Sequence, residues 1–417
     1  MLDHLRPDPR PAPPMVARAV QPLDAPLPEE LRDKITIDVI HDGAHLPPEL
    51  TVDGEGRPIP PELIHESFVR ERDWGALLVA ERVAARLGLP AVHTVNTARC
   101  LLDFGRFPGI SRKGASHLGR ASINEPFNTR LSSGQARRLL EEHYDAISQH
   151  MDEAIRGRQL KIAIHSYDRT NPSGTERPQV SIVSRSQGYQ NDGVMPYGVF
   201  DPLYPDILAE FTVDRILPSR MSLLLERMGV PVAHNYPYLL PEGSPEVRHQ
   251  VWSFFDWLQL RWEAHHPDTE GDPAFERVWE MLKDTNLRSS EAGALRSYIH
   301  RFRRAPEGEE RLFAEAERAY RNLGAFIEAG DRALVREYRR STERAMSFGI
   351  EVRKDMMWRF DSAGQPVELE PSRALCIADR IAEAIVVYLL EDRPHTDRSA
   401  EWARDGRWYG PGGQPTK

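Results

Sequence analysis

Short apolar segments alternate with segments of helical periodicity over residues 35–232 of this 417-residue chain. The strand-like segments include KITIDVI, LPAVHTV and LKIAI, and the helix-like segments span residues 73–87 and 135–155. This alternation is typical of an α/β sheet covered by helices on both faces. In such sheets the ligand site lies beyond the carboxyl ends of the strands. We therefore expect functional side chains at strand ends.

Composition narrows the classes of protein to consider. Hydrophobic residues make up 40% and charged residues 28% of the chain, as in a globular protein, and the formal net charge of −9 disfavours nucleic-acid binding. No apolar run approaches the length of a membrane span, and the N-terminal residues lack an apolar signal core. We expect a cytoplasmic protein with no membrane partner. Cys100 and Cys376 lack CxxC spacing, so any metal must be held by histidines and carboxylates.

The chain divides into four parts by composition. Residues 1–30 are rich in proline and are expected to form a flexible arm. Residues 31–244 and 348–392 carry the strand and helix patterns of the α/β domain. Residues 245–347 show only long helical patterns and are predicted to be an all-helical insertion. The polar residues 393–417 are predicted to form a flexible tail.

Two histidines follow strand-like segments directly. His41 comes directly after ITIDVI and His165 directly after LKIAI, so each imidazole is predicted to lie at an open strand end. A carboxylate at the entry to the helix of residues 73–87 could join them. Glu71 and Asp73 are both candidates, although an acid in this position often only caps the helix. Two histidines and one carboxylate form the open ligand set of catalytic zinc sites.

A glutamate inside an apolar strand is a further candidate. Glu351 lies in GIEVRKDMMW, and Arg353 follows two residues later on the same side of the strand. A buried glutamate is costly unless it is paired or used in chemistry. Either it forms a structural ion pair with Arg353, or it moves protons beside a metal that lowers the pKa of water to about 7.

Seven segments together resemble the N-formylglutamate amidohydrolase family, a branch of the zinc carboxypeptidase-like hydrolases. They are HDGAHLP, RDWGALLVAERVAARLG, VNTARCLLDFGRFP, LLEEHYDAISQHM, IAIHSYD, HNYPY and GIEVRKDMMW, and they occur in the order found in the family. The resemblance covers about residues 35–238 and 348–391. It implies a three-layer α/β/α sandwich with a mixed central sheet, of the zinc-exopeptidase-like class, and a zinc-dependent amide hydrolase.

The resemblance also assigns residues to roles. His41, Asp73 and His165 match the metal ligands, with Glu71 as the reserve ligand, and Glu351 matches the catalytic glutamate. Arg99 and Arg106 match arginines near the oxyanion or the substrate carboxylate. We expect Arg99 to assist catalysis. The further substrate contacts that we expect are Arg106, Arg353, His45, Asn96 and His234.

The expected reaction is hydrolysis of an amide in an N-formyl or N-acyl amino acid, or in a peptide bearing a carboxylate. One Zn²⁺ per chain is the expected cofactor, and iron or manganese would suit the same ligands. The alternative is a non-catalytic scaffold that keeps the fold and binds a partner through its helical insertion. We expect residues 245–347 to lie beside the mouth of the site and to restrict substrate size, or else to form an outer dimerisation module.

Overall fold

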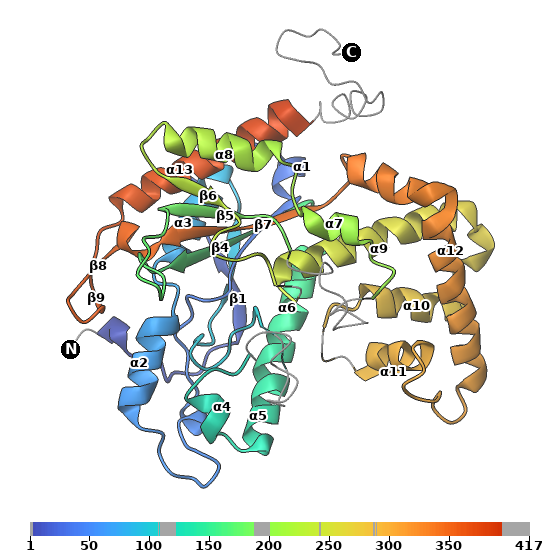
Figure 1. The fold of residues 1–417 in the computed structure, drawn as a ribbon, viewed down its shortest axis with the longest axis horizontal. Helices are drawn as coiled ribbons and strands as arrows, with labels where there is room; N and C mark the ends of the chain where they lie inside the picture. The colour runs from blue at the N-terminus through green and yellow to red at the C-terminus, as the bar shows by residue number, and fades with distance from the viewer. Residues whose placement is uncertain are drawn as a thin grey trace.

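The computed structural model describes residues 3–106, 108, 122–186, 201–241, 243–286, 288 and 290–393. Its centre is a seven-stranded sheet in the order β1-β3-β2-β4-β7-β5-β6. The strands are β1 (Met15–Ala19), β2 (Ile35–Val39), β3 (Ala91–Val95), β4 (Leu160–Tyr167), β5 (Val180–Val183), β6 (Val232–His234) and β7 (Met346–Arg353). Helices cover both faces, as Figure 1 shows. The predicted α/β architecture with a mixed central sheet is confirmed.

The sheet is mixed, because its central strands are parallel to one another and antiparallel strands flank them. Strands β3, β2, β4 and β7 are parallel to one another, whereas β1 is antiparallel to β3 and β5 is antiparallel to β7. Strands β4 and β7 are buried along their whole length, as expected for parallel strands covered on both faces. Their register places His165 opposite Glu351.

Part of the proline-rich N-terminal region belongs to the sheet. Residues Met15–Ala19 contain no proline and pair with β3 as edge strand β1. Prolines on either side of a short strand do not block its hydrogen bonds. The prediction of a flexible arm over residues 1–30 is therefore wrong for β1. The predicted tail lies outside the described residues, apart from Arg393.

One face of the sheet is covered by α3 (Ala76–Leu87), α8 (Ile216–Glu226) and α13 (Ser372–Val387). Apolar side chains from these helices and from the strands form one continuous core. In α3 the buried residues recur at helical spacing, and Gly88 ends the helix in the left-handed conformation. This face therefore forms in the way that the periodicity predicts.

The opposite face is covered by two long helical segments. Residues 133–155 run as α5 (Ser133–Leu139), a π-helical turn (Leu140–Tyr144) and α6 (Asp145–Ile155). Beside them, α9 (Pro245–His265) contacts β4 and β7. The first turns of α9 are almost fully buried, and Gln250 donates a hydrogen bond to Ser347 Oγ at 3.1 Å. Helix α9 is thus a layer of the sandwich, and the helical insertion does not begin at residue 245 as predicted.

A separate helical region lies to one side of the sandwich (Figure 1). It contains α10 (Pro273–Lys283), α11 (Ser290–Ile299) and α12 (Glu310–Arg340). The backbone of α12 is non-helical at Ala329–Arg332, so this helix consists of two segments joined by a kink. Together with α7 (Asp206–Glu210) and the middle of α9, these helices enclose a second, largely aromatic core.

The remaining described elements are short or lie at the periphery. They are α1 (Glu29–Arg32), α2 (Pro61–Glu71), α4 (Phe127–Arg130), the hairpin of β8 (Trp358–Phe360) and β9 (Pro366–Leu369), and several 3₁₀ and π turns. Among the described helices, none combines the length and the apolar character needed to cross a bilayer.

Candidate metal centre

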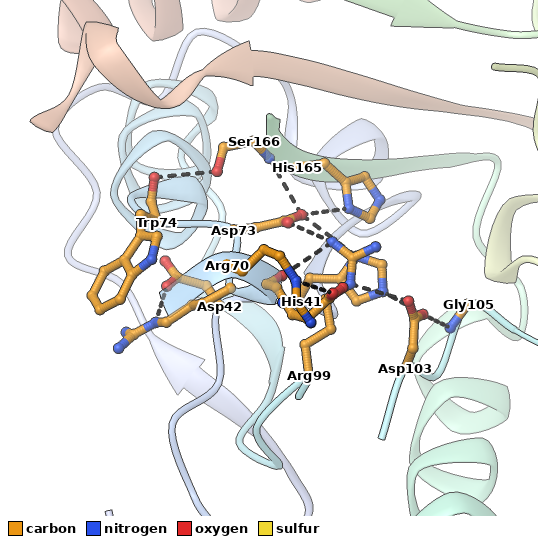
Figure 2. Close-up of polar contacts among 12 residues, drawn as sticks. His41, Asp42, Arg70, Asp73, Trp74, Arg99, Asp103, Gly105, His165 and Ser166 are labelled. Atoms are coloured by element: carbon orange, nitrogen blue, oxygen red, sulfur yellow. Dashed lines mark hydrogen bonds and ion pairs between the residues drawn. The ribbon is translucent and has the colours of Figure 1, made fainter. Parts of the chain in front are cut away.

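Three predicted ligands converge at the carboxyl ends of the central parallel strands. His41 follows β2, His165 lies near the end of β4, and Asp73 lies between α2 and α3. Their potential ligand atoms all lie within 4.8 Å of one another, and all three residues are buried. The Nδ1 atoms of His41 and His165 lie 3.4 and 3.2 Å from Asp73 Oδ2. Figure 2 shows both rings directed at this carboxylate. Asp73, rather than Glu71, belongs to the cluster.

The loop after β2 is shaped by a close approach of backbones. A Cβ atom at Gly43 would lie 2.5 Å from the carbonyl oxygens of Val95 and Asn96, so only glycine fits there. The loop is tied to the start of α3, because Asp42 accepts hydrogen bonds from the Leu77 amide at 3.1 Å and from Arg72 at 2.8 Å. These contacts place His41 beside the segment that carries Asp73.

Outer contacts fix two of the three ligands. Asp103 Oδ1 lies 2.8 Å from His41 Nε2, which leaves Nδ1 of that ring facing the cluster. Arg99 contacts Asp73 Oδ1 at 2.7 Å and Asp103 Oδ2 at 3.0 Å. A carboxylate on the far nitrogen of a ligating histidine is the usual outer support of a metal site. The contacts therefore fit a bound metal ion.

Electrostatics keep the predicted carboxylate ligand ionised. Burial acts to raise the pKa of Asp73, but Arg99 and the hydrogen bonds from His165 and His41 outweigh it and hold this pKa well below its usual value. Asp103 behaves in the same way, because the charges of His41 and Arg99 overcome its burial and lower its pKa. Ionised aspartate and histidine nitrogen are ligands that Zn²⁺ accepts, so the donor set fits the metal predicted from the sequence.

Glu351 enters the same site from β7. Its side chain is buried, and Oε2 has no hydrogen-bond partner among the described residues. Burial raises its pKa to about 7, with the charge of His165 acting to lower it and that of Asp73 to raise it. Glu351 is not the ion-pair partner of Arg353, because Arg353 bonds to Asp355 and Glu176 instead, at 2.8 and 2.7 Å. The structural alternative for Glu351 is therefore wrong.

These residues line one cavity of about 430 Å³. The predicted site residues on its wall are His41, Asp73, His165, Glu351, Arg99 and Arg106, with Glu71 beside them. Gly105 also lines it, and its backbone amide donates a hydrogen bond to Asp103 Oδ1 at 3.0 Å. The cavity thus combines a candidate metal site with a buried carboxyl group whose Oε2 has no hydrogen-bond partner among the described residues.

Four predicted substrate contacts do not line this cavity, and we no longer assign them to it. His45 lies near the N-terminal segment, where Nδ1 is 3.2 Å from the carbonyl oxygen of Asp8. Asn96 donates to the carbonyl oxygen of Pro13 at 2.8 Å, and His234 contacts Ser222 Oγ at 2.7 Å. Arg353 is held by the carboxylates described above. Each of these four side chains contacts another part of the protein instead of the cavity.

Sequence reasoning missed two sets of charged residues. Asp103 lies between the two predicted arginines and was not assigned a role. Lys161 is fully buried under the site, with Nζ 2.5 Å from Asp38 Oδ2 and 3.0 Å from Glu246 Oε1. Glu246 also lines the cavity. A charged residue inside each of the apolar strands ITIDVI and LKIAI was the available signal for this network.

The helical segment contributes little to the cavity wall. Pro245 and Glu246, at the start of α9, line the cavity, whereas no described residue of α10, α11 or α12 does. Among the described helices of residues 245–347, the expected contact with the site therefore comes from α9, which is the helix of this segment that packs on the sheet. A covering role for the other helices is not supported by the described residues.

Comparisons with known proteins give structural similarity at low sequence identity. No protein-family model matches the chain, and no curated protein matches its sequence. Among solved structures, N-formylglutamate amidohydrolase from Ralstonia eutropha aligns with 95% of this chain and 100% of its own, at 13% identity and a TM-score of 0.44. A gene product from Agrobacterium tumefaciens aligns with 88% of this chain and 92% of its own, at 16% identity and a TM-score of 0.37.

Proposed function

We propose that this protein is a metal-dependent amidohydrolase that acts on an N-formyl or N-acyl amino acid, or on a peptide bearing a carboxylate. The observation that carries the proposal is the buried His41–Asp73–His165 cluster with Glu351 in the same cavity. A ligand set of two histidines and one aspartate leaves a coordination position open for chemistry.

His41, Asp73 and His165 would hold the metal, and Zn²⁺ is the ion that we propose. When bound in such a site, the ion lowers the pKa of water and polarises a carbonyl group. Asp103 keeps the His41 ring oriented, and Arg99 holds the carboxylates of Asp73 and Asp103 together. Arg99 is thus a positioning residue in this proposal rather than a catalytic one, because its contacts go to these two carboxylates.

Glu351 is the general base and acid in this proposal. Its carboxylate accepts a proton from the attacking water and returns it to the nitrogen of the leaving amine. Burial raises the pKa of this carboxyl group, and a cation held by the neighbouring ligands would act to lower it. The paired register of β4 and β7 fixes Glu351 opposite His165, so the base and the metal ligands are held on adjacent rigid strands.

The test combines metal analysis with hydrolysis. The purified protein is loaded with Zn²⁺, its metal content is measured, and amine release is followed for N-formyl and N-acetyl amino acids and for dipeptides. We expect about one metal ion per chain and hydrolysis that a chelator abolishes and zinc restores. Glu351→Gln should bind the metal without hydrolysis. Absence of metal after zinc supplementation would favour the scaffold alternative and contradict the proposal.

A further inference from the structure

The cavity wall carries five cationic side chains, and four of them face a carboxylate. The pairs are Arg70–Glu71 at 3.1 Å, Arg99–Asp73 at 2.7 Å, Arg106–Asp103 at 3.0 Å and Lys354–Asp168 at 2.9 Å. The fifth cation is Arg177, which has no carboxylate within ion-pair distance among the described residues. Of these five cations, Arg177 is the one without an ion-pair partner in the part of the chain that the structure describes.

The hydrogen bonds of Arg177 are also incomplete. Its Nε atom is buried and has no hydrogen-bond partner among the described residues. Its Nη1 atom reaches the carbonyl oxygen of Asp168 only at 3.5 Å, the outer limit of a hydrogen bond. A buried N–H donor without an acceptor is costly, and the guanidinium as a whole is half-buried on the cavity wall, so an acceptor supplied by a ligand could reach it.

Several contacts hold Arg177 in place despite this missing acceptor. Its guanidinium carbon lies 5.2 Å from the ring centre of Tyr167, and the Tyr167 hydroxyl donates to the carbonyl oxygen of Pro178 at 2.7 Å. The backbone amide of Arg177 donates to Arg169, and its carbonyl oxygen accepts from Arg353 at 3.0 Å. Arg353 therefore acts as a positioning residue for the backbone of Arg177. Its own guanidinium is held by the carboxylates of Asp355 and Glu176.

The position of Arg177 relative to the metal centre follows from the strands. Tyr167 lies two residues beyond His165 on β4, so their side chains point to the same face about 7 Å apart along the strand. The register pairs Tyr167 with Arg353 just as it pairs His165 with Glu351. Arg177, packed on Tyr167, therefore lies one step further along the strand than the candidate metal centre.

We infer that Arg177 binds a carboxylate of the substrate, an inference that rests on the proposed hydrolase function. A guanidinium matches a planar carboxylate through two parallel hydrogen bonds. One uncompensated positive charge suits a monoanionic group. A phosphate dianion would carry more negative charge than Arg177 balances, and the carboxyl group of Glu351, whose Oε2 has no hydrogen-bond partner among the described residues, lines the same cavity. The predicted carboxylate contacts Arg99 and Arg106 are less suited, because Asp73 and Asp103 already neutralise them.

The experiment measures binding and not turnover. Butyrate, a monoanion, and its uncharged amide, butyramide, are titrated calorimetrically into the protein as purified and again in the presence of a chelator. Arg177→Gln removes the positive charge. Arg177→Lys keeps the charge but cannot form the two parallel hydrogen bonds of a guanidinium. Arg311→Gln is the matched control, because Arg311 is on α12, is 93% exposed and does not line this cavity. Circular dichroism checks that each variant folds.

We expect butyrate to bind and butyramide not to bind, with or without the chelator. Arg177→Gln should weaken butyrate binding about 10- to 100-fold, the usual effect of losing hydrogen bonds to a charged group. The affinity of Arg177→Lys should fall between those of Arg177→Gln and the wild type, and Arg311→Gln should bind like the wild type. Equal binding by Arg177→Gln, loss of binding in the chelator, stronger binding of inorganic phosphate, or no binding at all would overturn the inference. Intact Arg177-dependent binding without amide hydrolysis would instead overturn the proposed function alone.

Discussion

The metal-centre cavity and the helical region of α10–α12 are built from opposite chemistry. The cavity buries ionisable side chains against one another, including His41, Asp73 and His165. The helical region buries mainly aromatic and aliphatic side chains, such as Phe313 and Leu323. Helix α9 spans both regions, because its first residues are charged or polar and buried, whereas its middle joins the aromatic core.

The comparison of the cavity with the helical region shows under which conditions this protein buries charged side chains. Most charges in the cavity are compensated by a close partner, as in the contacts of Arg99 and Arg106. Glu351 and Arg177 are exceptions, since each keeps a buried polar atom without a hydrogen-bond partner in the part of the chain described. Such groups cost free energy of folding. The helical region gains stability from apolar burial instead, so mutations should separate function from stability.

The largest expected effect is loss of the metal. His165→Ala should remove Zn²⁺ binding and with it hydrolysis, whereas Asp103→Asn should weaken metal affinity only about 10- to 100-fold, because Asp103 acts through His41. Metal content after dialysis and amide hydrolysis are the measurements. His234→Ala is the control, since His234 lies outside the cavity. Equal metal binding by His165→Ala and the wild type would remove this residue from the ligand set.

The next effect separates chemistry from metal binding. Glu351→Gln should retain Zn²⁺ but lower kcat by about 10²- to 10⁴-fold, because an amide cannot accept the proton. Its free energy of unfolding should be unchanged or higher, since the variant no longer buries an ionisable carboxylate with an unpartnered oxygen. Hydrolysis assays and urea denaturation test the two parts. Unchanged kcat would show that Glu351 is not the proton acceptor.

A substitution in the aromatic core should have the converse effect, lowering stability without changing zinc affinity. Phe254 is fully buried, with its ring centre 5.7 Å from that of Tyr204 and 5.4 Å from that of Tyr338. Phe254→Ala should lower the free energy of unfolding by about 3–5 kcal/mol through cavity formation, with zinc affinity unchanged in the protein that remains folded. Leu260→Ala, at a position on α9 that is 63% exposed, is the control and should change stability little. Loss of zinc affinity in Phe254→Ala would mean that the two regions are coupled.

The smallest expected effect is on the pH dependence of the free energy of unfolding. It arises from His249 in the first turns of α9. Burial lowers the pKa of His249 to about 4; Lys161 also acts to lower it, while the contact with Arg158 and the charge of Glu246 act to raise it. His249 is therefore neutral in the folded state and takes up a proton on unfolding below about pH 6.5. Its contribution to stability is present above pH 6.5 and is lost as the pH falls toward 4.

His249→Gln should make this pH dependence shallower, by up to one proton or about 1.4 kcal/mol per pH unit between pH 6.5 and 4. The amide can still donate to the carbonyl oxygen of Arg158, which lies 3.0 Å from His249 Nε2. Urea denaturation at several pH values gives the slope. His265→Gln, at an exposed position on the same helix, should leave the slope unchanged. The same slope for His249→Gln and the wild type would mean that His249 is protonated in the folded state.

Much of this site could be predicted because its residues carry local signals. His41 and His165 follow apolar strands, and Asp73 precedes a helix of clear periodicity. Edge strand β1 was missed because the surrounding prolines dominate the composition of the N-terminal region. The locations of His45 and Asn96 could not be predicted, because each side chain contacts the N-terminal segment at long sequence separation. The special position of Arg177 depends on which cations find carboxylates in the fold, and no local pattern contains that information.

The most direct test of the metal centre is a crystal structure of the zinc-loaded protein with anomalous diffraction at the zinc edge. We predict one strong anomalous peak, with His41 Nδ1, Asp73 and His165 Nδ1 each about 2.0–2.2 Å from the ion. Glu351 should lie in the same cavity without ligating the ion. A peak held by other residues, or no peak between His41 and His165, would contradict the assignment of this cluster as the metal centre.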